Sequence, residues 1–441
     1  MSTTSISRRG LLAGGTAAAG ISVLQISGPA QALGSGSADS VPWLRQHGDP
    51  PESYPGAPNE EVLLWEDQPP PFPPGNGVGN QQVWEQLSTR LTPADNFFFV
   101  SHYGHPVIDP TTWRLGIDGL VARPGSLSLA QLKSRPRQRV EFTLECSGNT
   151  AFPVFTGAVG NAVWGGAPLA PILKRARPLG AAAEVVFWGT DSGSVTIRDN
   201  PGILSPGTTG TGTPDPDNPT RWDITITEQF ARSMTMDAAM APGNLLCYEM
   251  NGKPLPVEHG FPVRLIAPGW YGVANVKWLS RIELIGHRFA GRFMARDYVT
   301  FRERTDAAGK VTWTFQTVGP FRLKSAPAKV TRTVTAGRSS YRVIGIAWGG
   351  ATARVEVSID GGPWRQANLV TDGPQGGPTQ SLAWKFWTYD WGQVPSGRHT
   401  VASRAVGTDG AIQPSPDDPI ITERRTYWEA NQQITRTIVI P

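Results

Sequence analysis

The chain has 441 residues, with 40 lysines and arginines against 36 aspartates and glutamates, and a formal net charge of +4. So small a positive excess argues against a nucleic-acid partner, which requires a concentrated basic surface. Two cysteines and no C-x-x-C-H motif exclude a cysteine-ligated iron–sulfur cluster and a c-type haem.

Residues 1–32 have the three-part layout of an export signal. Two arginines in Ser7–Leu12 form a twin-arginine pattern, an apolar stretch continues to about Ile26, and Ala30–Ala32 is a small-x-small cleavage site. Glycines interrupt the apolar stretch, which is too weak and short for a stable membrane span. The alternative is a disordered N-terminus with chance arginines.

The export route itself carries information about the protein. Twin-arginine transport moves folded proteins, often with a cofactor already inserted. We therefore expect a periplasmic or other extracytoplasmic protein that acquires a cofactor before export.

The next region, residues 33–90, is rich in proline and glycine. We expect an extended arm that lies on the surface or wraps a partner.

Residues 91–320 alternate short strand and helix patterns, as in an α+β domain. A segment dense in Gly, Pro and Thr, Pro201–Thr220, predicts a long loop. The pattern predicts strands over Trp113–Gly119 and Glu184–Gly189 and short helices over Leu129–Leu132 and Leu169–Leu173.

Residues 321–441 have a different sequence pattern, because segments in which apolar and polar residues alternate recur at regular spacing. An Asp360–Gly362 hairpin turn separates two of them. This spacing predicts an immunoglobulin-like β-sandwich, a kind of domain that often serves as a docking or dimer surface. The predicted strands cover Ala328–Thr335, Ser340–Trp348, Ala353–Ile359, Trp384–Asp390 and His399–Val406.

One cysteine stands where chemistry is expected. Cys146 follows the strand-like run Val140–Glu145 and is followed by the small-residue turn Ser147–Asn149, which lets a bulky ligand approach the backbone. A thiolate is a soft-metal ligand and a nucleophile. Two alternatives stay open: an inert buried cysteine, or a disulfide with Cys247, which lies in an apolar run typical of buried core.

Basic residues gather in a second motif. His259 and Arg264 are followed by Lys277, and glycines between them keep the backbone accessible. Such a segment can hold a phosphate-bearing cofactor. The alternative is solvated surface charge.

These motifs occur in an order that resembles the sulfite oxidase family of molybdenum enzymes, from about Asn96 to the C-terminus. The resemblance implies an α+β molybdopterin-binding domain followed by an immunoglobulin-like β-sandwich, in a haem-free, exported bacterial enzyme. The motifs that carry it are the Cys146 turn, Trp164–Leu169, Tyr248–Pro256, His259–Trp278 and the hairpin Ser358–Trp364.

The resemblance also implies roles for single residues. Cys146 matches the cysteine whose thiolate ligates molybdenum, beside the pterin dithiolene and oxo groups, and Tyr298 matches an active-site tyrosine near the metal. The cofactor would be bound by His102, Asp191, Ser192, His259, Arg264 and Lys277. By analogy, the sandwich suggests a homodimer.

The implied reaction is oxygen-atom transfer that oxidises sulfite to sulfate, with electrons passed to a separate acceptor such as a cytochrome c. The chain departs from the family at substrate arginines, which fall here at Val100 and at Thr150–Ala151. Another family arginine, from the sandwich, has no counterpart. Other cations such as Arg198, Arg288 or Arg296 are candidates for replacing them.

Several functions therefore compete at this point. One is a sulfite dehydrogenase, and a variant of it acts on sulfane sulfur. Another is an exported reductase of sulfoxides such as oxidised methionine, against which the C-terminal sandwich weighs. The last is a non-enzymatic exported binding protein with a structural cysteine.

Overall fold

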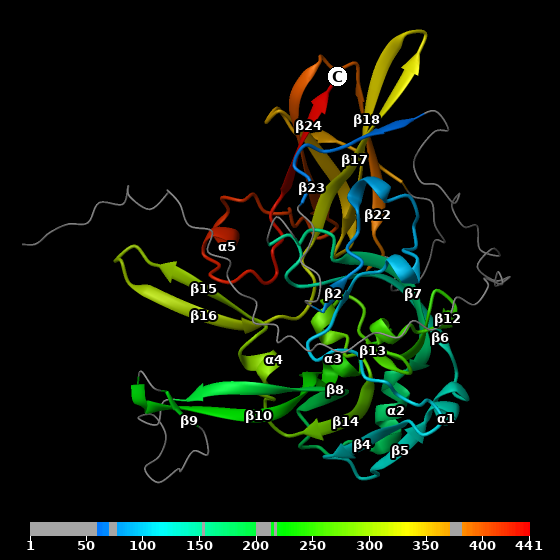
Figure 1. Cartoon of the computed structure of the whole chain (residues 1–441), viewed down its shortest axis with the longest axis vertical. Coiled ribbons are helices and arrows are strands. Elements are labelled where there is room, and N and C mark those ends of the chain that lie inside the picture. The colour runs from blue at the N-terminus through cyan, green and yellow to red at the C-terminus, as the bar shows by residue number, and fades with distance from the viewer. Residues whose placement is uncertain (1–59, 70–76, 152–154, 200–212, 216–217, 371–381) are drawn as a thin grey trace, which may run out of the picture.

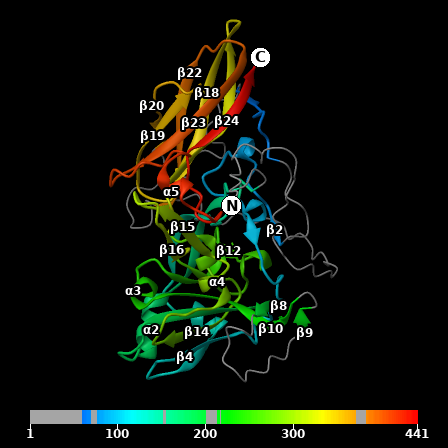
Figure 2. The same cartoon turned by 90° about the vertical axis from the view of Figure 1, so that its left-hand side faces the viewer.

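A computed structural model describes residues 60–69, 77–151, 155–199, 213–215, 218–370 and 382–441. The predicted export signal and the start of the arm lie outside the described residues. A β-sandwich is stacked on a larger, mostly β body, as Figure 1 shows from the front and Figure 2 from the side. The predicted order of an α+β domain and a sandwich is confirmed, although the helices are short.

The larger body contains a six-stranded sheet in the order β5-β4-β14-β8-β10-β9. β4 and β14 run parallel, and the other neighbours are antiparallel. Both strands predicted in this region are present. The members are β4 (Arg114–Gly119), β5 (Gly125–Ser128), β8 (Glu184–Asp199), β9 (Thr213–Asp215), β10 (Asn218–Thr235) and β14 (Leu279–Ile285).

Most of the long loop predicted over Pro201–Thr220 lies outside the described residues, and where the structure describes it the prediction is wrong, because β9 covers Thr213–Asp215 there. β10 begins at Asn218, and its pairing with β8 is continuous, apart from one bulge, from Trp222 opposite Asp199 to Thr235 opposite Glu184. The two strands project beyond the sheet as a ribbon (Figure 1). Inside the predicted loop Asn218 of β10 pairs with Asp215 of β9, and this pairing outweighs the turn-rich local composition, because a strand is stabilised by its partner as much as by its own residues.

A second sheet, in the order β12-β11-β7-β6 with β13 also paired to β11, carries the Cys146 turn at the end of β6. Gly166 lets β7 approach β11, because a side chain there would meet the backbone of Leu246 and Cys247. The strands are β6 (Gln138–Glu145), β7 (Val159–Pro168), β11 (Leu245–Met250), β12 (Lys253–Pro254) and β13 (Arg264–Ile266).

The described helices are short. Both predicted helices are present, and the one at Leu129 begins with a capping box between Ser128 and Gln131. None of the described helices is long and apolar enough to cross a membrane. The helices and 3₁₀ turns are α1 (Leu129–Lys133), α2 (Leu169–Ala176), α3 (Met236–Ala239), α4 (Arg292–Ala295), α5 (Pro419–Thr422), η2 (Trp84–Gln86), η3 (Ala94–Asn96), η4 (Val257–His259) and η5 (Gly272–Ala274).

The sandwich has one sheet in the order β1-β17-β18-β22-β21 and another in the order β20-β19-β23-β24. The predicted turn is present, with Asp360 and Gly361 both at positive φ. The five predicted strands are all found. The strands are β1 (Glu61–Leu63), β17 (Lys324–Thr335), β18 (Arg338–Trp348), β19 (Thr352–Ile359), β20 (Arg365–Gln366), β21 (Asn368–Leu369), β22 (Lys385–Gly392), β23 (Gly397–Gly407) and β24 (Ile434–Ile440).

The described part of the proline-rich arm is extended, but it does not lie loosely on the surface. β1 adds a strand to the sandwich sheet beside β17, and Trp65 packs into the sandwich core. Trp84 packs against Trp348 in a separate cluster, which also includes Val159 of the larger body. The arm therefore wraps its own chain and helps to seal the seam between the two bodies.

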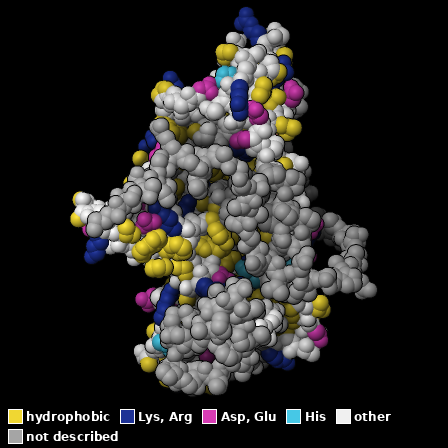
Figure 3. Space-filling model, turned by 60° about the vertical axis from the view of Figure 1, so that its left-hand side comes forward, with side chains coloured by type: hydrophobic (Ala, Val, Ile, Leu, Met, Phe, Trp, Pro, Cys, Tyr) yellow, Lys and Arg dark blue, Asp and Glu magenta, His cyan; other side chains and the backbone are white. Residues whose placement is uncertain are grey.

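A further hairpin, β15 (Val299–Thr305) with β16 (Val311–Thr317), projects from the larger body directly after Tyr298. Its exposed side chains include Trp313 and Phe315, and Figure 3 shows hydrophobic side chains on this face. β2 (Val78–Gly79) and β3 (Phe99–Val100) form a small pair whose second strand leads into the pocket described below.

We predict that Gly345→Ala destabilises the sandwich. A methyl group there would meet the ring of the buried Trp387 and the carbonyl oxygen of Ala326. Overpacking of this kind costs about 1–3 kcal/mol, so the thermal midpoint should fall by several degrees. Gly350→Ala is the matched control, because only a Leu323 methyl lies near, at 3.7 Å. Equal midpoints for both variants would contradict the prediction.

Candidate active site

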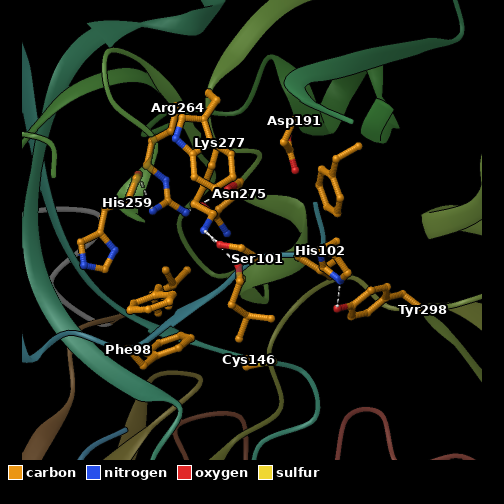
Figure 4. A pocket seen from close by; sticks show the side chains of 17 residues that line it. Phe98, Ser101, His102, Cys146, Asp191, His259, Arg264, Asn275, Lys277 and Tyr298 are labelled. Carbon is orange, nitrogen blue, oxygen red and sulfur yellow. Dashed lines mark hydrogen bonds between the residues drawn. The ribbon is translucent and has the colours of Figure 1, made fainter. Parts of the chain in front are cut away.

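Seven of the eight predicted site residues line one pocket in the larger body (Figure 4). The pocket gathers residues from several strands and turns, which only the tertiary fold brings together. The seven are His102, Cys146, Asp191, His259, Arg264, Lys277 and Tyr298.

Cys146 is held by the turn that follows β6. Its backbone N–H donates to the Ala158 carbonyl at 2.9 Å, and its carbonyl accepts from the Asn149 N–H at 3.0 Å. The residue keeps some exposed surface, yet its thiol is enclosed, and burial raises the pKa of that thiol to about 11. The sulfur is therefore a neutral thiol at physiological pH unless a bound cation displaces its proton.

His102 and Tyr298 form a pair near Cys146. The His102 Nε2 and the Tyr298 hydroxyl lie 2.8 Å apart and are hydrogen-bonded. Burial lowers the pKa of His102 to about 3 and raises the pKa of Tyr298 well above its ordinary value. Both side chains are therefore uncharged at neutral pH. Tyr298 keeps its hydroxyl proton, and the pair adds no charge to this end of the pocket.

Arg264 and Lys277 form the basic end of the pocket. The Arg264 guanidinium donates to the carbonyls of His259 and Asn275, and its Nε has no hydrogen-bond partner. The Lys277 ammonium donates to the carbonyls of Val100 and Glu258 and to the Ser101 hydroxyl. Burial lowers the pKa of Lys277 to about 7 and that of Arg264 to about 10, because charge is costly where water is excluded.

His259 completes the basic end at the end of η4. Its Nε2 lies 3.3 Å from the Ala94 carbonyl, and its ring meets Phe97 edge to face. Burial and the nearby Arg264 lower the pKa of His259 to about 3. This histidine is therefore neutral, and its ring supplies hydrogen-bonding capacity rather than charge.

Asp191 and Ser192 are neighbours on β8 but lie differently. Asp191 is buried in the pocket, and its Oδ1 has no hydrogen-bond partner. Burial raises the pKa of this carboxyl despite the nearby Lys277. Ser192 is exposed and does not line the pocket, because successive side chains of a strand point to opposite faces. Its predicted contact with the cofactor stays a prediction.

The disulfide considered between Cys146 and Cys247 is wrong, since both cysteines are free. Cys247 is fully buried in β11, as its apolar surroundings predicted, and its thiol donates to the Glu249 carbonyl at 3.1 Å.

The positions where the family arginines are missing lie close to the site. Val100 lines the pocket, and the Thr150 hydroxyl donates to the Ala430 carbonyl. Among the candidate replacement cations, Arg288 pairs with Glu184 and Arg296 with Asp297, and neither lines the pocket. The side chain of Arg198 lies outside the described residues.

Several residues of the site were not predicted. Ser101 and Asn275 line the pocket, and Asn275 fixes the neighbouring loop by accepting from the Ala267 N–H and donating to the Trp270 and Tyr271 carbonyls. Trp428 stacks on Tyr298 with ring centroids 4.2 Å apart. Asn275 lies within the motif His259–Trp278, whereas no sequence signal places Trp428 near the site.

Comparison with known proteins relates this arrangement to one family. Residues 102–202 and 215–293 match an oxidoreductase molybdopterin binding domain, and residues 323–425 match a Mo-co oxidoreductase dimerisation domain. The fold is similar to that of the sulfane dehydrogenase SoxCD from Paracoccus pantotrophus, with a TM-score of 0.64. That match covers 92% of this chain and 100% of that one, at 21% sequence identity.

Two sulfite oxidases show the relationship in sequence. The chain is 30% identical over 398 residues to sulfite oxidase of Gallus gallus, across 84% of this chain and 79% of that protein. It is 31% identical over 353 residues to mitochondrial sulfite oxidase of Homo sapiens, across 75% of this chain but 58% of the human protein. The chain belongs to the sulfite oxidase family of molybdopterin oxidoreductases.

Proposed function

We propose that the protein is an exported, haem-free molybdenum enzyme that oxidises sulfite, or a related inorganic sulfur compound, and passes the electrons to a separate acceptor such as a cytochrome c. The observation that carries this proposal is the placement of Cys146 in one pocket with a basic end and a neutral His102–Tyr298 pair. A soft-metal ligand and an anion-binding wall are the two features that molybdenum held by a phosphate-bearing pterin requires.

The residues of the basic end fit the cofactor. The hydrogen bonds of Arg264 and Lys277 go to carbonyl and hydroxyl oxygens, so neither buried cation is neutralised by a direct carboxylate hydrogen bond. The unpaired Arg264 Nε adds a donor. In our proposal these two cations and His259 hold the phosphate end of the pterin, while Asp191 and His102 contact its other parts.

At the opposite end Cys146 would supply the protein ligand to the metal. The bound cofactor supplies the oxygen-atom transfer and the two-electron redox change. Tyr298 keeps its proton at neutral pH because its hydroxyl is buried, so it can donate a hydrogen bond to a substrate oxygen. His102 orients that hydroxyl through their shared hydrogen bond.

The charge of the pocket favours a second substrate class beside sulfite. Val100 stands where the family places an arginine. Among the described residues that line the pocket, the one arginine is Arg264, and it lies at the basic end with Lys277 and His259 (Figure 4). A doubly charged anion such as sulfite is stabilised less in a pocket without further arginines than it would be beside several of them. Sulfane sulfur, as in the related sulfane dehydrogenase, is therefore the alternative substrate, and a sulfoxide is a third.

The remaining parts of the proposal concern location and assembly. The twin-arginine pattern in residues 1–32 supports export to the periplasm or another extracytoplasmic space. The dimerisation domain over residues 323–425 supports a homodimer. The two cysteines of the chain support electron transfer to a separate protein rather than to a c-type haem within it.

The first test is reduction of ferricyanide by molybdenum-loaded protein supplied with sulfite. Turnover at micromolar sulfite supports sulfite oxidation. Turnover with sulfane sulfur but not with sulfite selects the alternative substrate, and reduction of a sulfoxide by reduced protein selects the third. Molybdenum-loaded protein that turns over none of these would contradict the proposed function.

We predict that Cys146→Ser folds but loses sulfur-oxidising activity by several orders of magnitude, because an alkoxide oxygen is a poorer match to molybdenum than a thiolate. Metal content and turnover should be measured together. Cys247→Ser is the control, since that cysteine is also buried but lies outside the pocket. Full activity of Cys146→Ser would remove the assignment.

We predict that the cofactor-free protein binds sulfate more weakly as pH rises above 7. Burial lowers the pKa of Lys277 well below that of an exposed lysine, so its charged form is lost at a lower pH, and anion binding requires the charged form. Calorimetric titration with sulfate, which does not itself titrate in this range, measures the effect. Lys277→Arg should remove most of this dependence, because arginine stays charged. The same pH dependence in Lys277→Arg and the unaltered protein would contradict the role of Lys277.

We predict that Val100→Arg lowers the KM for sulfite. Val100 lines the pocket, and a charge-assisted hydrogen bond is worth about 1.5–3 kcal/mol, which corresponds to about tenfold or more in binding. Val100→Met is the uncharged control of similar length. An unchanged KM in both variants would show that the missing arginine does not limit sulfite binding.

A further inference from the structure

A buried ion pair joins the sandwich to the Cys146 turn. Glu145 is the last residue of β6, directly before Cys146, and Lys324 is the first residue of β17. The Lys324 ammonium lies 2.5 Å from Glu145 Oε1, and the exposed fractions of the two side chains are 1% and 0%. The two residues are far apart in the sequence and belong to different bodies. The pair therefore forms only because the sandwich docks on the larger body.

Hydrogen bonds connect this pair to both sides of the turn. The Asn149 side-chain amide donates to Glu145 Oε1 at 3.0 Å, and its carbonyl oxygen accepts from the Ala158 N–H at 3.0 Å. Ala158 in turn accepts from the Cys146 N–H. Lys324 also donates to the Thr150 hydroxyl at 3.2 Å, at a residue with a positive φ of 67°. The ammonium group therefore contacts the residue before Cys146 and a residue after it.

The charges explain why the turn needs this lysine. When Cys146 serves as a thiolate ligand, it adds a second negative charge beside the buried Glu145 carboxylate. Oxygen Oε2 of the Glu145 carboxylate has no hydrogen-bond partner. Among the described residues, Lys324 is the cation that pairs with this carboxylate. In a site that excludes water, an uncompensated neighbouring charge acts strongly on the metal and its ligands.

We propose that Lys324 is a positioning residue for Cys146: it neutralises Glu145 and holds the turn from both sides, so the sandwich sets the electrostatic surroundings of the metal ligand. This inference rests on the proposed function, in which Cys146 ligates molybdenum. It gives the sandwich a part in the active site besides dimerisation.

The test measures the midpoint potential of the molybdenum centre by redox titration of the Mo(V) electron paramagnetic resonance signal. Three variants are compared: Lys324→Met, Glu145→Gln, and both together. Negative charge near the metal favours its oxidised form, so Lys324→Met should lower the potential. Glu145→Gln should raise it, and the double variant should return close to the starting value. Lys329→Met is the control, since this lysine of β17 donates to the Leu87 carbonyl instead.

A purely structural role predicts something else. Loss of packing would lower the thermal stability of the variants, while their potentials would stay equal or shift in one direction. Equal potentials, or potentials that shift in the same direction in both single variants, would overturn the inference. Should Lys324→Met fail to fold, the comparison of Glu145→Gln with the neutral double variant still isolates the charge of Lys324, and equal potentials for these two overturn the inference.

The proposed function fails separately. Molybdenum content of the unaltered protein and of Cys146→Ser is measured in the same preparations. If Cys146→Ser retains metal with an unchanged spectrum, then Cys146 is not a ligand, and both proposals fall. If that variant loses the metal or its spectrum while the potentials of the charge variants do not move in opposite directions, only the role of Lys324 is overturned.

Discussion

The site depends on burying positive charge that no direct carboxylate hydrogen bond neutralises. Arg264 and Lys277 are enclosed, and most of the hydrogen bonds that they make go to carbonyl oxygens. Carbonyls orient a cation but do not neutralise it, so the cost of removing these groups from water is only partly offset, as the lowered pKa values of both groups show. An anionic ligand would offset the rest, which is the role that our proposal gives to the phosphate of the pterin.

At the opposite end of the same pocket, burial keeps the side chains neutral. Cys146, His102 and Tyr298 are all enclosed there, and burial keeps each of them neutral until a ligand binds. A metal that takes the thiolate supplies the charge itself. In our proposal the basic end and the neutral end bind different parts of one cofactor, so that electrostatics as well as shape would orient it.

Sequence could predict most of the pocket, but by two routes: Cys146 and the stretch from His259 to Lys277 carry their own local signal, whereas His102, Asp191 and Tyr298 were predicted only from the resemblance to the sulfite oxidase family. The turn after Cys146 and the glycine-framed stretch from His259 to Lys277 are local, and the structure brings them together. Alternation along β8 could have separated Asp191 from Ser192, since neighbours on a strand face opposite sides. Where the loop expected before Thr220 is described, it is replaced by the paired residues of β9 and the start of β10, and local composition did not reveal that pairing.

Contacts across the seam lay beyond prediction for a different reason. Lys324 and Glu145 are 179 positions apart, and the Trp428–Tyr298 stack likewise joins residues from the two bodies. Each of these residues read singly is an ordinary strand or loop residue, and only docking of the sandwich gives it a role. A catalytic domain that supplied its own counter-charge to Glu145 could work with any partner domain. Here that charge comes from β17 and the stacked ring from the segment after α5, so the active site is complete only when both domains are folded and docked.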